Sequence, residues 1–324
     1  MINFLTVGIL SGLASALLFA VVVTGSPFGI VLSYVAPLPV LIGALGWNHR
    51  SGLVAVAVGG LAIALAFQAE AGLAFVIGSA LPAWWLAYLA LLGRQNPDGS
   101  MEWYPLGRLL LWIAASAALV TFVGVLALGS WEYATYRETL RTTIESVVRI
   151  QMQVPTDTAL PPTFGGVPRE QFLEALVGAV PFLAATAFAL VLTLNLWIAA
   201  KVVAISQRLP RSWPAIAATR MPQSALLLLG AAILVSFVPG FVGVMALAFA
   251  GGLLMAFALQ GLALLHAVSR GRPGRTGLLV GAYILLAFIA HTFLPILALA
   301  GIADTVVDLR RRFPPGGAGP TPTV

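Results

Sequence analysis

Cysteine is absent from this chain of 324 residues, and charged residues are scarce. The lack of cysteine excludes disulfide bonds, thiolate metal sites and cysteine nucleophiles. Only 9% of the residues are charged and 60% are hydrophobic, whereas a soluble domain carries about 25% charged residues. One soluble core could not bury so much apolar surface, but a lipid bilayer can accept it. Composition therefore predicts an integral, multi-pass membrane protein.

Sequence motifs of catalysis are missing as well. The chain has no phosphate-binding loop, no HExxH, no GxSxG and no acidic cluster with two-metal spacing. We therefore expect no catalytic residue, no bound metal and no cofactor. Lys201 is the only lysine, so the net charge of +6 comes almost wholly from arginine. Because the arginines flank apolar runs, they indicate contact with anionic lipid headgroups rather than with nucleic acid.

Long apolar runs separated by glycine, proline or charge predict eight membrane-spanning helices. They cover 3–24, 28–47, 52–68, 72–92, 108–129 and 172–203, followed by a seventh and an eighth that divide at Pro239-Gly240 and end near His266. An additional apolar block, 276–309, is too long for one ordinary span and short for two. The predicted fold is an all-α, polytopic transmembrane bundle, with 1–312 as one membrane domain and 313–324 as a disordered cytoplasmic tail.

The only long polar segment is 130–171. In its first half, apolar residues recur every three or four positions at Tyr133, Tyr136, Leu140, Ile144 and Val147. This spacing predicts one amphipathic helix on the surface of the membrane or of the other spans. Glu145 and Arg149 are placed to form an i,i+4 ion pair on its polar face. The second half, 154–168, is rich in Pro, Thr and Gly and is expected to be an irregular loop.

Basic residues mark alternate loops. Ten of them fall in loops on one side, against two acids: Arg50, Arg94, Arg108, Lys201, Arg208, Arg211, Arg220, Arg270, Arg272 and Arg275. The positive-inside rule then predicts a cytoplasmic N-terminus, with 130–171 outside. A single crossing by 276–309 would leave 310–312 outside. We therefore favour a tight or re-entrant hairpin hinged near Pro295, the alternative being translocated arginines.

Four residues are candidate ligand contacts. Trp84 and Trp85 follow Pro82 in the middle of the fourth span, where they either wall an apolar cavity or only pack. Asn195 in the sixth span is expected to bond a neighbouring helix, with a ligand contact as the alternative. His291 lies deep in the last apolar block, where it either lines a cavity or bonds a backbone carbonyl.

Five residues are candidates for docking to a partner or to lipid. Ala16 and Ala20 lie on a small-residue face of the first helix, a pattern that favours close helix packing. Asp304 and Asp308 lie one helical turn apart near Arg310. Two carboxylates at this spacing could bind a cation or dock a partner, or they could pair with the arginines at the membrane edge.

Four short segments carry a resemblance to a known family. They are 301–312 (GIADTVVDLRRR), 12–16 (GLASA), 36–39 (APLP) and 81–85 (LPAWW). With them, about 1–312 resembles the YybS-like family of bacterial inner-membrane proteins, whose domain has no assigned function. That family is distantly similar to the substrate-binding subunits of energy-coupling-factor transporters, which dock a coupling protein through small residues of the first helix. Ala16 and Ala20 match that face, although this chain is longer and carries the additional segment 130–171.

Two functions are compatible with these observations. The first is a substrate-binding or permease-like component for a small molecule, working with a membrane coupling protein. The second is a non-catalytic scaffold for envelope assembly or cell shape, because the same broad grouping includes a rod-shape membrane protein. An intramembrane enzyme is a distant third, since few ionisable residues lie within the spans.

Overall fold

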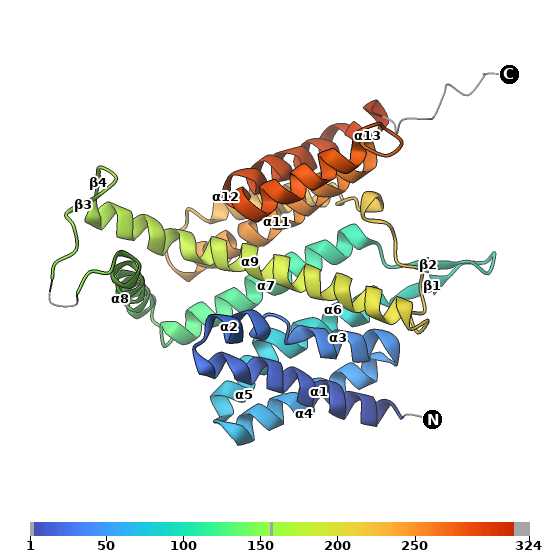
Figure 1. The fold of residues 1–324 in the computed structure, drawn as a ribbon, viewed down its shortest axis with the longest axis horizontal. Coiled ribbons are helices and arrows are strands. Elements are labelled where there is room, and N and C mark those ends of the chain that lie inside the picture. The colour runs from blue at the N-terminus through green and yellow to red at the C-terminus, as the bar shows by residue number, and fades with distance from the viewer. Residues whose placement is uncertain (1–2, 156–157, 314–324) are drawn as a thin grey trace.

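The computed structural model describes residues 3–155 and 158–313 as a bundle of helices (Figure 1). Its first half holds α1 (Phe4–Ala20), the 3₁₀ turn η1 (Val21–Thr24), α2 (Pro27–Ser33), α3 (Pro37–Gly46), α4 (His49–Ala66), α5 (Ala69–Phe75), the π-helical turn η2 (Val76–Ala80) and α6 (Leu81–Ala90). Prolines stand in the first turns of α2, α3 and α6, where the missing N–H costs no hydrogen bond. The first four spans are therefore partly built from short helices joined end to end.

The second half is dominated by longer helices. Its elements are β1 (Gly93–Gln95), β2 (Met101–Trp103), α7 (Leu106–Leu128), α8 (Tyr133–Met152), β3 (Thr163–Phe164), β4 (Val167–Pro168), α9 (Arg169–Ile205), η3 (Ile216–Ala218), α10 (Ser224–Val235), α11 (Phe241–Val268), α12 (Arg275–Val307) and α13 (Leu309–Arg312). The strands form two small antiparallel hairpins in segments predicted to be loops. The expected tail from 314 onward lies outside the described residues.

Among the described residues, eight helices are long and apolar enough to cross a membrane, which confirms the all-α polytopic class. This set of eight helices differs from the predicted set by one helix. The predicted seventh span contains α10, which has only 12 residues. At 1.5 Å per residue such a helix covers about 18 Å, less than the roughly 30 Å hydrocarbon layer. The eighth long helix is instead α12, within the C-terminal apolar block.

The helix α12 folds back on itself at Ile289, whose backbone leaves the helical region (Figure 1). Its first residue, Arg275, lines the same space as Ala217, and Arg310, just past its end, donates to the carbonyl of that same Ala217. A straight helix of 33 residues would hold its two ends about 50 Å apart. The block therefore forms the predicted hairpin, but its hinge is Ile289, and Pro295 lies within the second arm.

Glycines bring the helices of the bundle into close contact. A Cβ on Gly12 of α1 would lie 2.6 Å from the carbonyl oxygen of Ala55 on α4. On the other side of the molecule, a Cβ on Gly261 of α11 would lie 1.9 Å from the carbonyl oxygen of Leu297 on α12. In a bilayer, helices associate through such backbone approach and van der Waals packing rather than through the hydrophobic effect.

The loops rich in arginine gather at one end of the bundle. Arg208 lies over the ring of Trp47 at 4.5 Å, and Arg211 donates to the carbonyls of Ala90 and Tyr104. In Figure 1 the start of α1, β1, β2 and α13 lie at this basic end, whereas α8, β3 and β4 lie at the opposite end. The hairpin in α12 returns 310–312 to the basic end, so the arginines expected on one side of the membrane lie together.

The helix α8 has the amphipathic character predicted for it. Tyr136 and Leu140 are buried, and Glu145 forms the expected ion pair with Arg149 at 3.1 Å. Arg137 pairs with Glu174 of α9, which joins α8 to the end of a long span. Val147, predicted to lie on the apolar face, is exposed instead because the contact with the bundle ends before it.

Candidate functional site

An apolar cavity of about 380 Å³ lies among α7, α9, α11 and α12 at the basic end of the bundle. Its walls are mainly leucines and isoleucines of these helices, together with Trp197 of α9 and Trp213. Thr193, Thr219 and Tyr283 contribute the hydroxyl groups of the lining, and Thr193 already donates to the carbonyl of Ala189. The cavity therefore offers shape and apolar contact and few hydrogen bonds, as expected for an apolar solute or hydrocarbon chain.

The loop 206–223 forms one wall of the cavity and covers it at the basic end; we call this segment the roof loop. It carries Pro210, Pro214 and Pro222, whose rings remove backbone donors and prevent a long helix. Its only regular element among the described residues is the short turn η3. Because the roof loop has so little backbone hydrogen bonding of its own, side-chain hydrogen bonds to the rest of the chain must hold it in place.

Arg211 anchors the first half of the roof loop. This side chain is buried and donates from Nη1 to the carbonyl of Ala90 at 2.8 Å and to that of Tyr104 at 3.2 Å. Its guanidinium also lies over the rings of Trp103 and Trp213 at 5.7 and 5.5 Å. Burial lowers the pKa of Arg211 from its ordinary value. The carbonyl bonds and ring faces partly replace the water that the cation has lost.

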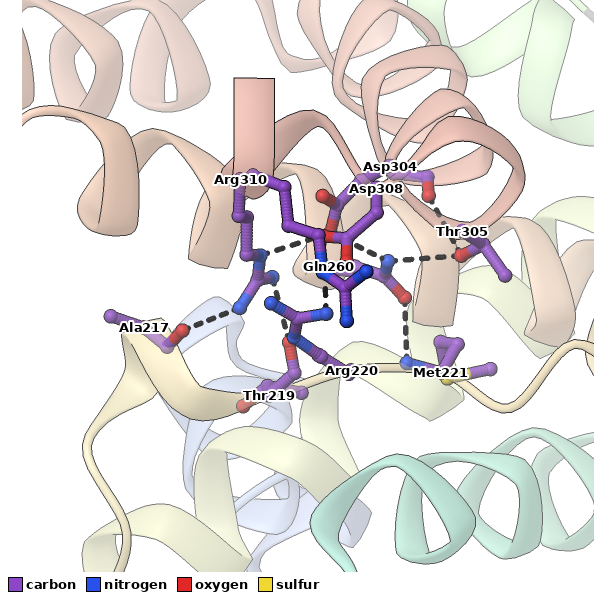
Figure 2. Close-up of polar contacts among 11 residues, drawn as sticks. Ala217, Thr219, Arg220, Met221, Gln260, Asp304, Thr305, Asp308 and Arg310 are labelled. Atoms are coloured by element: carbon purple, nitrogen blue, oxygen red, sulfur yellow. Dashed lines mark hydrogen bonds and ion pairs between the residues drawn. The ribbon is translucent and has the colours of Figure 1, made fainter. Parts of the chain in front are cut away.

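Gln260 of α11 connects the second half of the roof loop to α12. Its Oε1 accepts from the backbone N–H of Met221 at 2.7 Å, and its Nε2 donates to Asp304 Oδ2 at 3.0 Å and to Thr305 Oγ1 at 2.9 Å (Figure 2). The Gln260 side chain is almost wholly buried. A buried amide with both ends bonded in this way fixes the relative position of its partners.

Arg310 completes this network. Its Nε donates to Asp304 Oδ2 at 3.0 Å, and its two terminal nitrogens donate to the carbonyls of Ala217 and Thr219 in the roof loop (Figure 2). The side chains of Arg310 and Asp304 are 8% and 2% exposed. Burial lowers the pKa of Arg310, and the charge of Asp304 opposes this effect. The pair therefore ties α12 and α13 to the cover of the cavity.

The two predicted carboxylates do not converge on a common ligand. Asp304 pairs with Arg310, whereas Asp308 pairs with Arg220 at 3.1 Å and Arg311 at 3.0 Å. This is the arginine pairing that the sequence offered as one alternative. Asp308 adopts a left-handed backbone conformation with φ of 46°, which turns the chain from α12 into α13. The turn points the two carboxylates to different arginines.

A second space, of about 390 Å³, adjoins the apolar cavity. The two share Trp197, Trp213, Pro214 and Ile216 as walls. Its other lining residues include four basic or titratable side chains, which we call the basic mouth: Lys201, His266, Arg270 and Arg275. Sequence reasoning assigned Lys201, Arg270 and Arg275 to loops and His266 to the end of a span, and did not connect them with a cavity.

Trp84 and Trp85 border a different cavity, of about 310 Å³, with Trp112 of α7. Trp84 Nε1 donates to the carbonyl of His49 at 3.0 Å, and His49 is the first residue of α4. The expectation that these tryptophans lie in the middle of a span is therefore wrong. They lie near the basic end of the helices, at the depth where tryptophan is usual, because α6 ends only five residues after Trp85.

Asn195 and His291 line none of these three spaces. Asn195 Nδ2 donates to the carbonyl of Tyr34, in the turn after α2, and to that of Val191, both at 2.9 Å. Asn195 thus bonds a neighbouring helical segment, which is the first of the two roles expected for it. His291 is exposed two residues after the Ile289 turn, so it is not deep in the protein. The hairpin places it at the outer face of the tip of α12.

The small-residue face of α1 is occupied within the chain. Ala16 is 4% exposed and belongs to the core, and Ala20 packs against that core. Gly8 and Gly12 on the same face meet α4 so closely that even a Cβ would clash. Ala16 is therefore not available for docking to a coupling protein, because α4 already fills the groove that small residues create.

Several residues of the site escaped sequence reasoning. Gln260 is an isolated polar side chain in the apolar α11, which otherwise has only His266 in its last turn, and this isolation could have indicated a functional role. Arg211 and Trp213 lie in an irregular loop and carried no such signal in the sequence. The carbonyls that Arg211 bonds are more than one hundred residues away along the chain. The role of Arg211 and Trp213 depends on how the chain folds back.

Comparison with known families gives one match. The model of the family described as predicted membrane protein (DUF2232) matches residues 13–305. Neither the comparison with curated proteins nor that with solved structures gave a significant match. The family match covers all the long helices except the start of α1 and the end of α12, including the cavity and most of its anchors. The chain therefore belongs to this family of membrane proteins.

Proposed function

We propose that the protein is a substrate-binding or permease-like membrane component that takes a small molecule into the apolar cavity beneath the roof loop. The observation that carries this proposal is the cavity itself, about 380 Å³ in volume and covered by a loop with three separate anchors. Ligand pockets typically enclose about 300–1,000 Å³ and are mainly apolar. In this proposal the roof loop, held by Arg211, Gln260 and Arg310, is the part of the site that moves to admit the ligand.

The proposed setting is a bacterial inner membrane with the basic end in the cytoplasm. The collection of arginine-rich loops at one end supports this orientation, since positive loops are retained inside. The resemblance to energy-coupling-factor substrate-binding subunits adds to the proposal of a binding component. A coupling protein would have to dock at a surface other than Ala16, which α4 covers.

A cavity-filling variant tests the proposal. Leu262 of α11 lines the cavity, so Leu262→Trp should occupy it. Leu227→Trp is the matched control, because Leu227 of α10 is exposed on the outside of the bundle. After purification in nanodiscs and native mass spectrometry, we expect a molecule of fixed mass to be retained by the wild type and by the control, and to be lost from Leu262→Trp. Equal retention by all three proteins, or none by the wild type, would overturn the proposal.

A scaffold for envelope assembly is the second candidate, and the surface of α8 favours it. Trp131, just before α8, and Ile150 on it are 77% and 75% exposed, although α8 lies beyond the spans. Such exposed apolar side chains mark a contact with a membrane surface or with another protein. In this role α8 would hold an envelope protein while the spans only anchor the chain.

The two roles differ in which variant affects the cell. A scaffold predicts that Ile150→Glu, or deletion of 131–152, disturbs cell shape while Leu262→Trp does not. A binding component predicts the reverse, with altered growth or solute uptake in Leu262→Trp cells. A normal shape in cells with the deletion would exclude the scaffold role of α8.

A further inference from the structure

The basic mouth and the apolar cavity lie next to each other. They share the lining residues Trp197, Trp213, Pro214 and Ile216. Lys201 extends from α9 one turn beyond Trp197, with its Nζ 5.9 Å from the centre of that ring. One side of the space is therefore apolar and the other cationic, which matches an amphiphile with an acidic headgroup.

The cations of the mouth have no acidic partner in the described part of the chain. Lys201, Arg270 and Arg275 form no ion pair there, and no aspartate or glutamate lines the mouth. Moreover, the Nε of Arg275 is buried without a hydrogen-bond partner among the described residues. A buried donor without an acceptor costs free energy, which an anion from outside the chain would recover.

The neighbouring arginines show that this lack of partners is local. At the same end of the molecule, Arg220 and Arg311 pair with Asp308, and Arg310 pairs with Asp304. Among the described residues, carboxylates thus lie next to the roof loop, and none lines the mouth. Since the mouth lies at the ends of α9, α11 and α12, its height corresponds to the headgroup layer of the bilayer.

We propose that this space holds an anionic membrane lipid, with the phosphate of its headgroup among Lys201, Arg270 and Arg275 and a hydrocarbon chain in the apolar cavity. The inference rests on the proposed function, because it assigns a chemical class to the ligand of the same cavity. A lipid is preferred to free phosphate because the apolar cavity next to the mouth offers leucine, isoleucine and tryptophan contacts that only an apolar chain can use. Arginine and lysine both bind phosphate, arginine through a bidentate fork.

Lipid retention by the full chain tests this assignment. The protein is purified in detergent, incubated with equal amounts of phosphatidylglycerol and phosphatidylcholine, and examined by native mass spectrometry. The test variant is the triple change Lys201→Gln, Arg270→Gln and Arg275→Gln. The matched control removes three exposed positive charges of the same end that line neither space: Arg50→Gln, Arg108→Gln and Arg312→Gln.

We expect the wild type and the control to retain phosphatidylglycerol at least tenfold better than phosphatidylcholine, and the test variant to lose this preference. Equal losses in the test variant and the control would overturn the inference, because they would indicate general attraction to surface charge. Displacement of the lipid by millimolar inorganic phosphate would also overturn it, since the hydrocarbon chain would then contribute nothing. Thermal unfolding of each variant shows whether a loss of lipid reflects a loss of fold.

The failure of this inference is distinguishable from the failure of the proposed function. If Leu262→Trp abolishes retention of a bound molecule but the mouth variant does not, the cavity binds a ligand without an acidic headgroup. The proposed function would then stand and the assignment of an anionic lipid would fall. If Leu262→Trp has no effect on any retained molecule, both fall together.

Discussion

Arg310 of α13 and Asp304 of α12 form an ion pair with 3.0 Å between Nε and Oδ2, and both side chains are almost wholly buried. The same guanidinium donates to two carbonyls of the roof loop, so the pair connects the end of the chain to the cover of the cavity (Figure 2). Buried ion pairs contribute little net stability, but removing one partner leaves the other charge uncompensated. The pair therefore serves to position the roof loop more than to hold the bundle together.

The first prediction concerns this pair. Asp304→Asn and Arg310→Gln should each lower the free energy of unfolding by about 3–5 kcal/mol, because each leaves one buried charge without its partner. The double variant should lose clearly less than the sum of the two, and this coupling is measured by a double-mutant cycle in detergent. Strict additivity would show that the two side chains do not interact. Arg311→Gln, an exposed arginine near the same site, is the control and should change stability little.

The second prediction concerns the contact between α11 and α12. A Cβ on Gly301 would lie 2.0 Å from the carbonyl oxygen of Phe257, and neither backbone can yield without separating the two helices. Gly301→Ala should therefore destabilise the protein by about 1–3 kcal/mol. The control is Gly281→Ala in the first arm of α12, where a Cβ would meet nothing within 4 Å. That change should stabilise by about 0.5–1 kcal/mol through helix propensity, so opposite signs in thermal unfolding are expected.

The third prediction concerns topology and uses the absence of cysteine. Single cysteines replace four exposed residues: Met101, Thr142, Pro273 and Arg312. An impermeant maleimide applied to intact cells should label only Thr142→Cys, and the other three should react after the membrane is opened. Labelling of Arg312→Cys in intact cells, with Met101→Cys protected, would contradict the hairpin in α12. If the other three variants are labelled in intact cells and Thr142→Cys is not, the hairpin is still supported but the orientation of the whole protein is the reverse of the predicted one.

The fourth prediction concerns Tyr136 on α8. Its hydroxyl is buried without a hydrogen-bond partner among the described residues, so Tyr136→Phe should be neutral or should stabilise by up to about 1–3 kcal/mol. Burial, and secondarily the neighbouring Tyr133, raises the pKa of Tyr136 to about 12. Because the folded-state pKa lies above the ordinary value of about 10, the stability from neutral Tyr136 is present below pH 10 and is lost toward pH 12.

A spin label at Ser146→Cys reports this alkaline transition as an increase in the mobility of α8. In the wild type the mobility should rise between about pH 10 and pH 12, and Tyr136→Phe should remove that step. A step of unchanged size in Tyr136→Phe would assign it to another group. A marked loss of stability in Tyr136→Phe at neutral pH would show that the hydroxyl does have a partner.

Much of the architecture was accessible from the sequence because it depends on local pattern. Apolar runs of span length predicted most of the membrane helices, and a spacing of three and four residues predicted α8 with its Glu145–Arg149 pair. The conflict between the last apolar block and Arg310 even indicated a hairpin. These predictions succeed because the bilayer fixes helix length, and because residues one turn apart on a helix are neighbours whatever surrounds them.

The hinge and the helix lengths were less accessible. Pro295 was the expected hinge, but the backbone leaves the helix at Ile289, a residue with no turn preference. Similarly, the apolar run after Pro222 looked like a full span but forms only the short α10. Neighbouring helices decide such points, because a chain can bend where packing requires it and a proline can remain within a helix.

The sequence by itself determined that this protein is a polytopic helical membrane protein, which end collects its positive charge and where its amphipathic segment lies. Only the tertiary structure decided what the candidate residues do. It buried Ala16 in the core and paired Asp304 with Arg310. It also bonded Gln260 to Met221 and placed Lys201 and Arg275 in the lining of one space. The physical reason is distance along the chain. Ala217 lies 93 residues from Arg310 along the chain, and Met221 lies 39 residues from Gln260. No local propensity encodes which of many apolar helices will meet.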